Sequence, residues 1–312
     1  MNTQSNAIPE SFSESRAVAP VVISEAQRLY WLVRRELWEN RSIYIAPLAV
    51  AGLILFGFLI SVFHLPGKMR AALALSPMQQ HDLIEQPYTF AALFIMGISF
   101  IVAVFYCLDA LHGERRDRSI LFWKSLPVSD LTTVLSKAFI PLVVLPLIAF
   151  ATVEITQLIM RLLNTAVLLA NGMSPALLWA NGAPFEGSLV LLYGLAVTAL
   201  WYAPVYGWLL LVSGWARRAT FLWALLPPFA FCVAEAIAFH TWRFAAMLKY
   251  RLSGGFAEAF AVRGHSDGYP KVGLDQLDPV KFLGTPGLWI GLGLAAVFLA
   301  AAVWLRRNRE PV

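Results

Sequence analysis

The sequence predicts an all-α polytopic membrane protein with six transmembrane helices. Of its 312 residues 59% are hydrophobic and only 14% are charged, whereas soluble domains are about half apolar and about a quarter charged. Apolar windows recur at the length of about 20 residues that a helix needs to cross about 30 Å of hydrocarbon. Because lipid offers no hydrogen-bond partners to the backbone, such windows are expected to be helices.

Six windows have the required length. They cover residues 43–63, 88–108, 138–160, 188–212, 219–240 and 288–305, and together they form a transmembrane domain over residues 42–305. The fifth window contains the pair Pro227-Pro228. Since two prolines remove two backbone donors, we expect a kink in that helix. In the sixth window Gly287, Gly291 and Ala295 are spaced by four residues, which predicts a close approach by a neighbouring helix.

Basic residues beside the spans predict the orientation in the membrane. With six spans, the basic clusters fall on one side: Arg28, Arg34, Arg35 and Arg41 before the first span, five residues within 109–137, Arg217 and Arg218 after the fourth span, and Arg306, Arg307 and Arg309 after the sixth. Cytoplasmic loops carry the excess of Lys and Arg. We therefore expect a multi-pass protein of the bacterial cytoplasmic (inner) membrane with both termini in the cytosol.

The segments flanking the domain are more polar. Residues 1–23 are expected to be a disordered cytosolic N-terminus, and residues 306–312 a cytosolic tail. Residues 24–41 predict an amphipathic helix in the cytosolic interface, with Trp31 and Trp38 on one face.

Two segments on the opposite side are too apolar for free loops. Residues 162–180 predict a broken pair of interfacial or re-entrant helices, and residues 242–262 predict a second helical segment interrupted at Gly254-Gly255. Residues 263–287 are polar and rich in Gly and Pro, and they predict a surface loop.

The polar segment of residues 109–137 separates the second span from the third. It is longer than a turn between spans requires, and its residues 109–123 can continue the second span as a charged helix. Pro127 ends that pattern, and Ser129 is a candidate N-cap for a helix that continues through Lys137 into the third span. This pattern indicates a cytosolic docking element.

Several kinds of chemistry are missing from the sequence. It contains no G-x-x-x-x-G-K-[ST] phosphate-binding loop and no H-E-x-x-H metal motif, so we expect no ATPase activity and no enzyme. Cys107 and Cys232 fall in separate spans without neighbouring metal ligands, which argues against a disulfide or a metal site. No soluble module carries clustered basic and aromatic residues, so nucleic-acid binding is not expected.

The polar segment resembles the permease subunit of type-2 ABC exporters. In that family E-R-x-x-x-[ST]-[IL] is followed by a short helix, by [LS]-P-V-S and by a lysine before the third span. The matching residues are Glu114, Arg115, Ser119, Ile120, Leu126, Pro127, Val128, Ser129 and Lys137, and the similarity in layout extends over nearly the whole chain from about Ser24.

The resemblance implies partners and a mechanism. Glu114, Arg115, Arg116, Arg118, Leu126, Pro127, Ser129 and Lys137 would belong to a coupling helix seated on a separate cytosolic ABC ATPase, which would carry the ATP-Mg. This chain itself would bind no cofactor. A second permease chain, forming a homodimer or a heterodimer, would face it across a substrate pathway within the lipid bilayer, and the segment after the fifth span would be the family's external re-entrant hairpin.

Glu154 and Glu235 are the carboxylates within the predicted spans. Each lies sixteen residues from the start of its span, or about 24 Å into the membrane, and intramembrane carboxylates usually face a bundle interior or water. They are candidates for the substrate pathway, or else they are bonded to neighbouring helices. Two other functions remain open: a membrane scaffold or assembly factor, and an ion-coupled secondary transporter that uses both glutamates.

Overall fold

The computed structural model describes residues 24–65, 67, 76–117, 129–180, 184–260 and 274–308, and these residues are almost entirely helical. Among them, six helices are long and apolar enough to cross a membrane. The β pairing in the described part is a single bridge between Phe260 and Leu277. The expectation of an all-α chain with six helices suited to crossing a membrane is therefore confirmed for the described residues.

The first half of the chain contains three of the spans. Helix α1 (Glu25–Glu39) starts at a capping box of Ser24 and Gln27. It leads into α2 (Ser42–Ser61) with the 3-10 turn η1 (Val62–His64), and then come α4 (Pro77–Asp109) and the short α5 (His112–Arg116). The third span is continuous from α7 (Asp130–Phe139) through the π-helix η2 (Ile140–Val144) to α8 (Leu145–Ala170). As expected, Ser129 caps α7 by accepting a hydrogen bond from the Thr132 backbone.

The second half starts with the short helix α9 (Ala176–Ala180). It is followed by α10 (Pro184–Trp215), α11 (Thr220–Phe239) and α12 (Arg243–Ala259), and the chain ends in η3 (Leu274–Gln276), α13 (Pro279–Gly284) and α14 (Pro286–Asn308). Helix α11 is assigned as one helix that runs through both Pro227 and Pro228. Helix α12 is too short to count among the membrane-spanning candidates.

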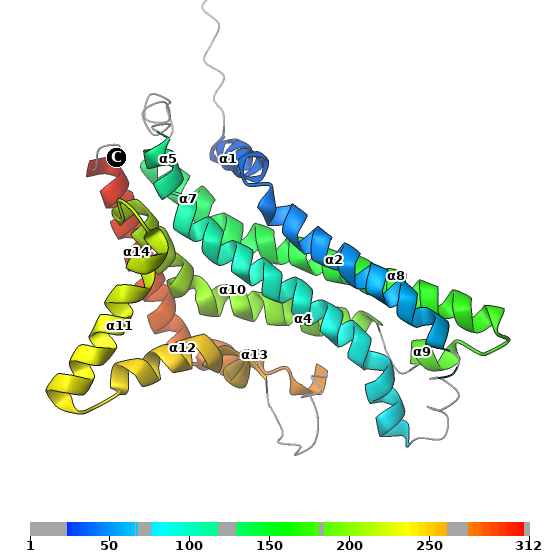
Figure 1. The fold of residues 1–312 in the computed structure, drawn as a ribbon. Coiled ribbons are helices and arrows are strands. Elements are labelled where there is room, and N and C mark those ends of the chain that lie inside the picture. The colour runs from blue at the N-terminus through cyan, green and yellow to red at the C-terminus, as the bar shows by residue number, and fades with distance from the viewer. Residues whose placement is uncertain are drawn as a thin grey trace, which may run out of the picture.

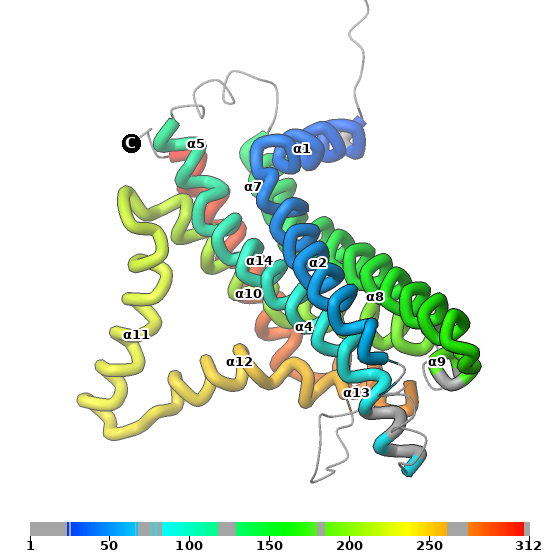
Figure 2. Tube along the Cα trace, turned by 45° about the vertical axis from the view of Figure 1, so that its right-hand side comes forward, coloured from blue at the N-terminus to red at the C-terminus, as the bar shows by residue number. Residues whose placement is uncertain are grey.

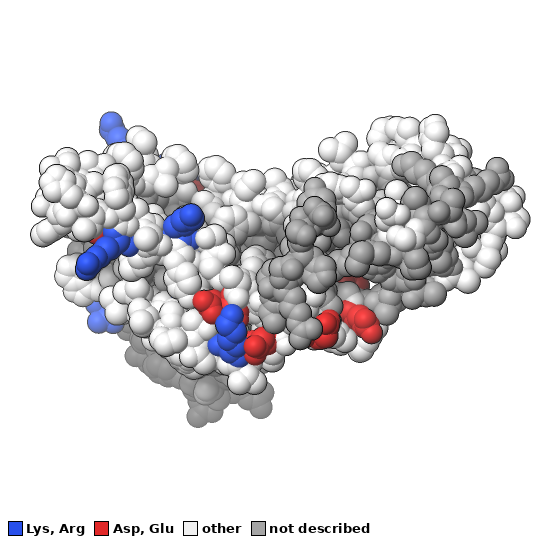
Figure 3. Space-filling model, turned by 90° about the horizontal axis from the view of Figure 1, so that it is seen from below, with Lys and Arg blue, Asp and Glu red and all other residues white. Residues whose placement is uncertain are grey.

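The helices form a bundle with two distinct ends (Figure 1). Helices α1 and α5 and the C-terminal end of α14 lie at one end, which we call the α1 end; α12 and α13 lie at the other, the α12 end. Helix α11 stands away from the bundle (Figure 2), and in its most apolar window only 6% of the residues are buried. Seen from the α12 end, the described surface is largely uncharged, with scattered acidic and basic side chains (Figure 3).

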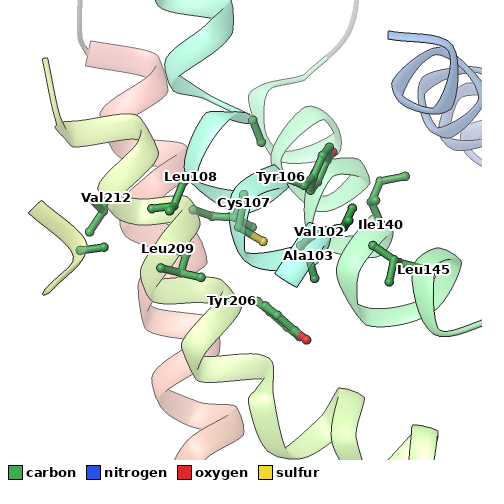
Figure 4. Close-up of a cluster of buried hydrophobic side chains, with 14 of the residues drawn as sticks. Val102, Ala103, Tyr106, Cys107, Leu108, Ile140, Leu145, Tyr206, Leu209 and Val212 are labelled. Atoms are coloured by element: carbon green, nitrogen blue, oxygen red, sulfur yellow. The ribbon is translucent and has the colours of Figure 1, made fainter. Parts of the chain in front are cut away.

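The main core lies toward the α1 end, where α4, α7, η2 and α10 meet. Tyr106 and Cys107 of α4 point into it beside Ile140 of η2 and Tyr206 of α10 (Figure 4). Cys107 and Ile140 are completely buried, and in a membrane domain such close van der Waals packing is a main source of helix association. This core packs α4, α7, η2 and α10 together at the α1 end.

Two helices extend beyond the windows read from the sequence. Helix α4 begins at Pro77 instead of residue 88, and α8 continues to Ala170. We had expected residues 162–170 to belong to a separate interfacial segment, but in the structure they are part of α8. The helix stops at Asn171, and Gly172 follows with a φ of +71°, a conformation that glycine adopts at low cost.

The expected break at Gly254-Gly255 is wrong, because α12 runs through both residues. Both glycines instead permit close packing. A Cβ at Gly255 would lie 2.8 Å from Cγ of Trp201, and one at Gly254 would lie 2.8 Å from Cδ2 of Tyr250. The glycine pair therefore holds α12 against the buried ring of Trp201 on α10.

The small residues of α14 do accommodate close neighbours, but of two kinds. A Cβ at Gly207 of α10 would lie 3.3 Å from the carbonyl oxygen of Ala295, so these two helices approach closely. Gly291 instead faces the guanidinium of Arg251 on α12, which fills the space of its missing Cβ. That guanidinium also donates to the Gly287 carbonyl at 3.0 Å and lies 4.6 Å from the ring centroid of Trp201, and its burial lowers the pKa of Arg251.

Candidate functional site

Helices α5 and α10 cap each other at the α1 end. The hydroxyl of Ser213, near the end of α10, accepts hydrogen bonds from the backbone N–H groups of Leu111 (3.0 Å) and His112 (2.9 Å). In return, the Arg115 guanidinium donates to the carbonyl of Gly214 at 2.8 Å and approaches that of Ala216 at 3.4 Å. Helix ends leave such groups without intrahelical partners, so this exchange attaches α5 firmly to the fourth span.

A buried charge network surrounds this attachment. It consists of Glu36, Glu114, Asp130, Lys137 and Arg306, contributed by α1, α5, α7 and α14. Lys137 Nζ lies 2.8 Å from Glu36 Oε1 and 3.2 Å from Glu114 Oε1. Arg306 joins the other side, with Nη2 3.1 Å from Glu114 Oε2 and Nη1 2.8 Å from Asp130 Oδ1. Four helices thus share one set of ion pairs.

Further polar groups contact the network. The Tyr106 hydroxyl of α4 donates to Glu36 Oε2 at 2.9 Å, and Arg35 Nη2 lies 3.7 Å from Glu114 Oε1. With Arg35 included, three basic side chains face three carboxylates. Glu36 and Lys137 are each 2% exposed, and burying charges is costly unless they are paired and hydrogen-bonded. The network therefore holds the helices in one arrangement, and loss of Lys137 would leave buried carboxylates with fewer compensating partners.

A cavity of about 10 Å³ adjoins the network and is lined by Leu111, Glu114, Arg115, Gly214 and Arg306. This volume suits about one water molecule. The side chains around the network are therefore closely packed. It does not have the volume of a small-molecule pocket.

The expected coupling residues fall into three groups. Glu114, Arg115 and Lys137 are buried and contact this chain's own helices, so their side chains are not at the surface where an ATPase was expected to touch them. Arg116 and Ser129 are exposed, and Arg116 pairs with Asp109 and Asp117. Arg118, Leu126 and Pro127 lie outside the described residues.

Glu154 and Glu235 are not brought together in this chain. Glu154 lies within α8 and accepts a 2.7 Å hydrogen bond from Ser188 at the start of α10. Glu235 lies on α11, on the opposite side of the fold (Figures 1 and 2).

The contacts of Glu235 favour the structural alternative. Its Oε1 accepts hydrogen bonds from the Thr241 hydroxyl at 2.8 Å and the Arg243 backbone at 2.9 Å, and its Oε2 accepts from the Phe244 backbone at 2.8 Å. Glu235 therefore caps the N-terminus of α12, where a carboxylate also interacts favourably with the helix dipole. This role accounts for its position without a substrate.

Three members of the network were missed in the sequence. Glu36 sits on the buried stripe of α1, four residues after Leu32, and a carboxylate in such a stripe is a signal for a buried basic partner. Asp130 follows the cap of α7 and gave no such signal. Arg306 had been placed in a tail, but α14 continues to Asn308 and buries it.

Among the described residues, no three His, Cys, Asp or Glu side chains are grouped so as to hold a metal ion. Comparisons with protein-family models, curated proteins and solved structures found no match to this chain.

Proposed function

We propose that this chain is the membrane subunit of an ABC exporter and receives ATP-driven motion from an ATPase on a separate chain. The observation that carries the proposal is the anchoring of the polar segment. Residue 117 follows α5, which is tied to α10 and α14, and residue 129 precedes α7, which is tied to α1 and α14. The intervening residues 118–128 are thus attached at both sides to the membrane helices through buried polar contacts.

This anchoring suits transmission of force. A push on residues 118–128 would act on α5 and α7, and the charge network would pass the displacement to α1 and α14, while the mutual caps would pass it to α10. Packed helices move as discrete bodies because cores deform little. Motion of several spans together is what alternating access to a pathway requires. The motif resemblance of residues 114–137 supports the same assignment.

The proposal includes the setting of the chain. Both ends of the described part lie at the α1 end, and the basic residues around it favour a cytosolic location by the positive-inside rule. Helix α12 would then lie on the external side as part of the re-entrant hairpin. A second permease chain would complete the pathway, and the sparsely buried α11 offers apolar surface to that chain or to lipid.

The first test is copurification. The full chain is tagged, isolated from membranes of cells that express it naturally, and its partners are identified by mass spectrometry. We expect a P-loop ATPase and a second permease chain, with ATP hydrolysis retained after reconstitution into liposomes. Isolation without any P-loop ATPase would refute the proposal and leave the scaffold as the better assignment. Transport that follows a proton gradient without ATP would instead favour a secondary transporter.

The second test addresses the docking element. Arg118→Glu changes the charge within the polar segment, and Arg307→Glu makes the same change on an exposed residue at the same end of the bundle. We expect Arg118→Glu to reduce ATPase copurification or to uncouple hydrolysis from transport, and Arg307→Glu to do neither. Arg115 is a poor choice for this test because it caps α10. Equal behaviour of both variants would show that residues 118–128 do not dock the ATPase.

A further inference from the structure

Helix α1 has two faces of different character. Leu32 and Glu36 are buried against the bundle, whereas Tyr30, Trp31 and Trp38 are 59%, 57% and 71% exposed on the outward side. The sequence predicted an amphipathic helix with Trp31 and Trp38 on one face. The structure places the aromatic side chains away from the protein, together with a basic residue.

That residue is Arg34, whose guanidinium lies between the two tryptophans. Its Cζ is 5.3 Å from the ring centroid of Trp31 and 5.7 Å from that of Trp38. Cation–π contacts of this kind hold a cation in place. None of the hydrogen bonds or ion pairs among the described residues uses the Arg34 guanidinium, whereas the neighbouring Arg35 is paired with Glu39 and Glu114. Arg34 is therefore held outward with its planar set of N–H donors available.

The position of α1 decides which partner fits. The helix precedes the first span and lies across the end of the bundle (Figure 2). Tryptophan rings concentrate at the level of the lipid headgroups, and a guanidinium binds phosphate through paired N–H donors. If α1 lies at the membrane boundary, the exposed tryptophans can contact the lipid near the headgroups, and the guanidinium between them can bind the phosphate of a lipid headgroup.

We propose that Arg34, held by Trp31 and Trp38, binds the headgroup phosphate of an anionic phospholipid. The bound lipid sits on the outward face of α1, opposite Glu36 and the charge network. Lipid binding at this face thereby sets the position of the helix that carries Glu36. The site does not depend on the identity of the transported substrate or on the presence of an ATPase.

The test uses the full chain in a nonionic detergent, titrated with phosphatidylglycerol or phosphatidylcholine, with bound lipids counted by native mass spectrometry. Arg34→Gln is expected to weaken the tightest phosphatidylglycerol binding about fivefold, as for one basic residue near an anionic surface, and to leave phosphatidylcholine binding unchanged. Arg34→Lys should fall between the two because it keeps the charge without the planar donors. The double variant Trp31→Leu, Trp38→Leu should weaken binding with the charge intact.

The matched control is Arg218→Gln, which removes the same charge from an exposed position between α10 and α11 at the same end. It should retain full phosphatidylglycerol binding. Equal loss in Arg218→Gln and Arg34→Gln would reveal only general charge attraction, and unchanged binding in Arg34→Gln would remove the site; either result overturns the proposal. Displacement by millimolar inorganic phosphate would show a free-anion site and also overturn it. An unchanged thermal unfolding midpoint excludes misfolding as the cause of a loss.

Discussion

Replacement of Lys137 by methionine is the most direct test of the charge network. Methionine has a similar length and no charge, so it fills the space while removing both ion pairs, to Glu36 at 2.8 Å and to Glu114 at 3.2 Å. Both carboxylates remain buried. Taking away one partner of a buried pair costs about 3–5 kcal/mol, because a charge is left without compensation.

The contacts that remain place the expected loss at the lower end of that range. Glu36 keeps the Tyr106 hydroxyl at 2.9 Å, and Glu114 keeps Arg306 at 3.1 Å. We therefore expect the free energy of unfolding to fall by about 3 kcal/mol. The double variant Glu36→Gln, Lys137→Met should recover part of this loss, about 1–2 kcal/mol, because it removes one of the two uncompensated charges.

Cys107 supplies the assay. Its thiol is completely buried in the core beside Tyr106, so a thiol-reactive fluorophore labels it only when the core opens. In a Cys232→Ser background, a loss of about 3 kcal/mol should accelerate labelling roughly 100-fold, since each 1.4 kcal/mol is a factor of ten. Unchanged labelling of Lys137→Met, with an unchanged thermal midpoint, would refute the structural role of the network.

Two further predictions concern contacts between helices. Ser213→Ala removes the acceptor for two backbone N–H groups at the start of α5 and should cost about 1 kcal/mol, as loss of an N-cap does; the same change at the exposed Ser61 is the control, and equal midpoints would contradict the capping role. Gly291→Ala places a Cβ in the space of the Arg251 guanidinium and should lower the thermal midpoint, whereas Gly293→Ala, which meets nothing within 4 Å, should not. Adding Arg251→Ala to Gly291→Ala should restore part of the loss, and a Gly291→Ala protein as stable as the native chain would show that α12 does not pack there as described.

Local signals in the sequence were sufficient to predict the helices but not how far each helix extends. Composition and length predicted the six spans, and Ser129 was recognised as the cap of α7 because that hydrogen bond forms within three residues. The continuation of α8 to Ala170 was not predicted, because residues 162–180 were expected to form a separate broken segment. In the structure Asn164 is buried and its amide nitrogen donates to the Tyr88 hydroxyl at 2.9 Å, and this partner lies on another helix.

Only part of the candidate site could be predicted from the sequence. The motif drew attention to Glu114, Arg115 and Lys137, but their roles as internal partners depend on α1, α10 and α14. The same applies to Gly254 and Gly255, which were taken for a break because the ring of Trp201 that packs on them lies in a different helix.

Six helices suited to crossing a membrane could be predicted from the sequence alone, because hydrocarbon thickness and the need to pair every backbone polar group act on each segment separately. Which charges pair depends on the packing of the helices. Glu114 and Arg306 are 192 residues apart in the chain and 3.1 Å apart in space, and Arg34 faces outward while Arg35 turns to Glu114. These pairings depend on which helices become neighbours, because a buried charge is tolerated only where a neighbouring group compensates it.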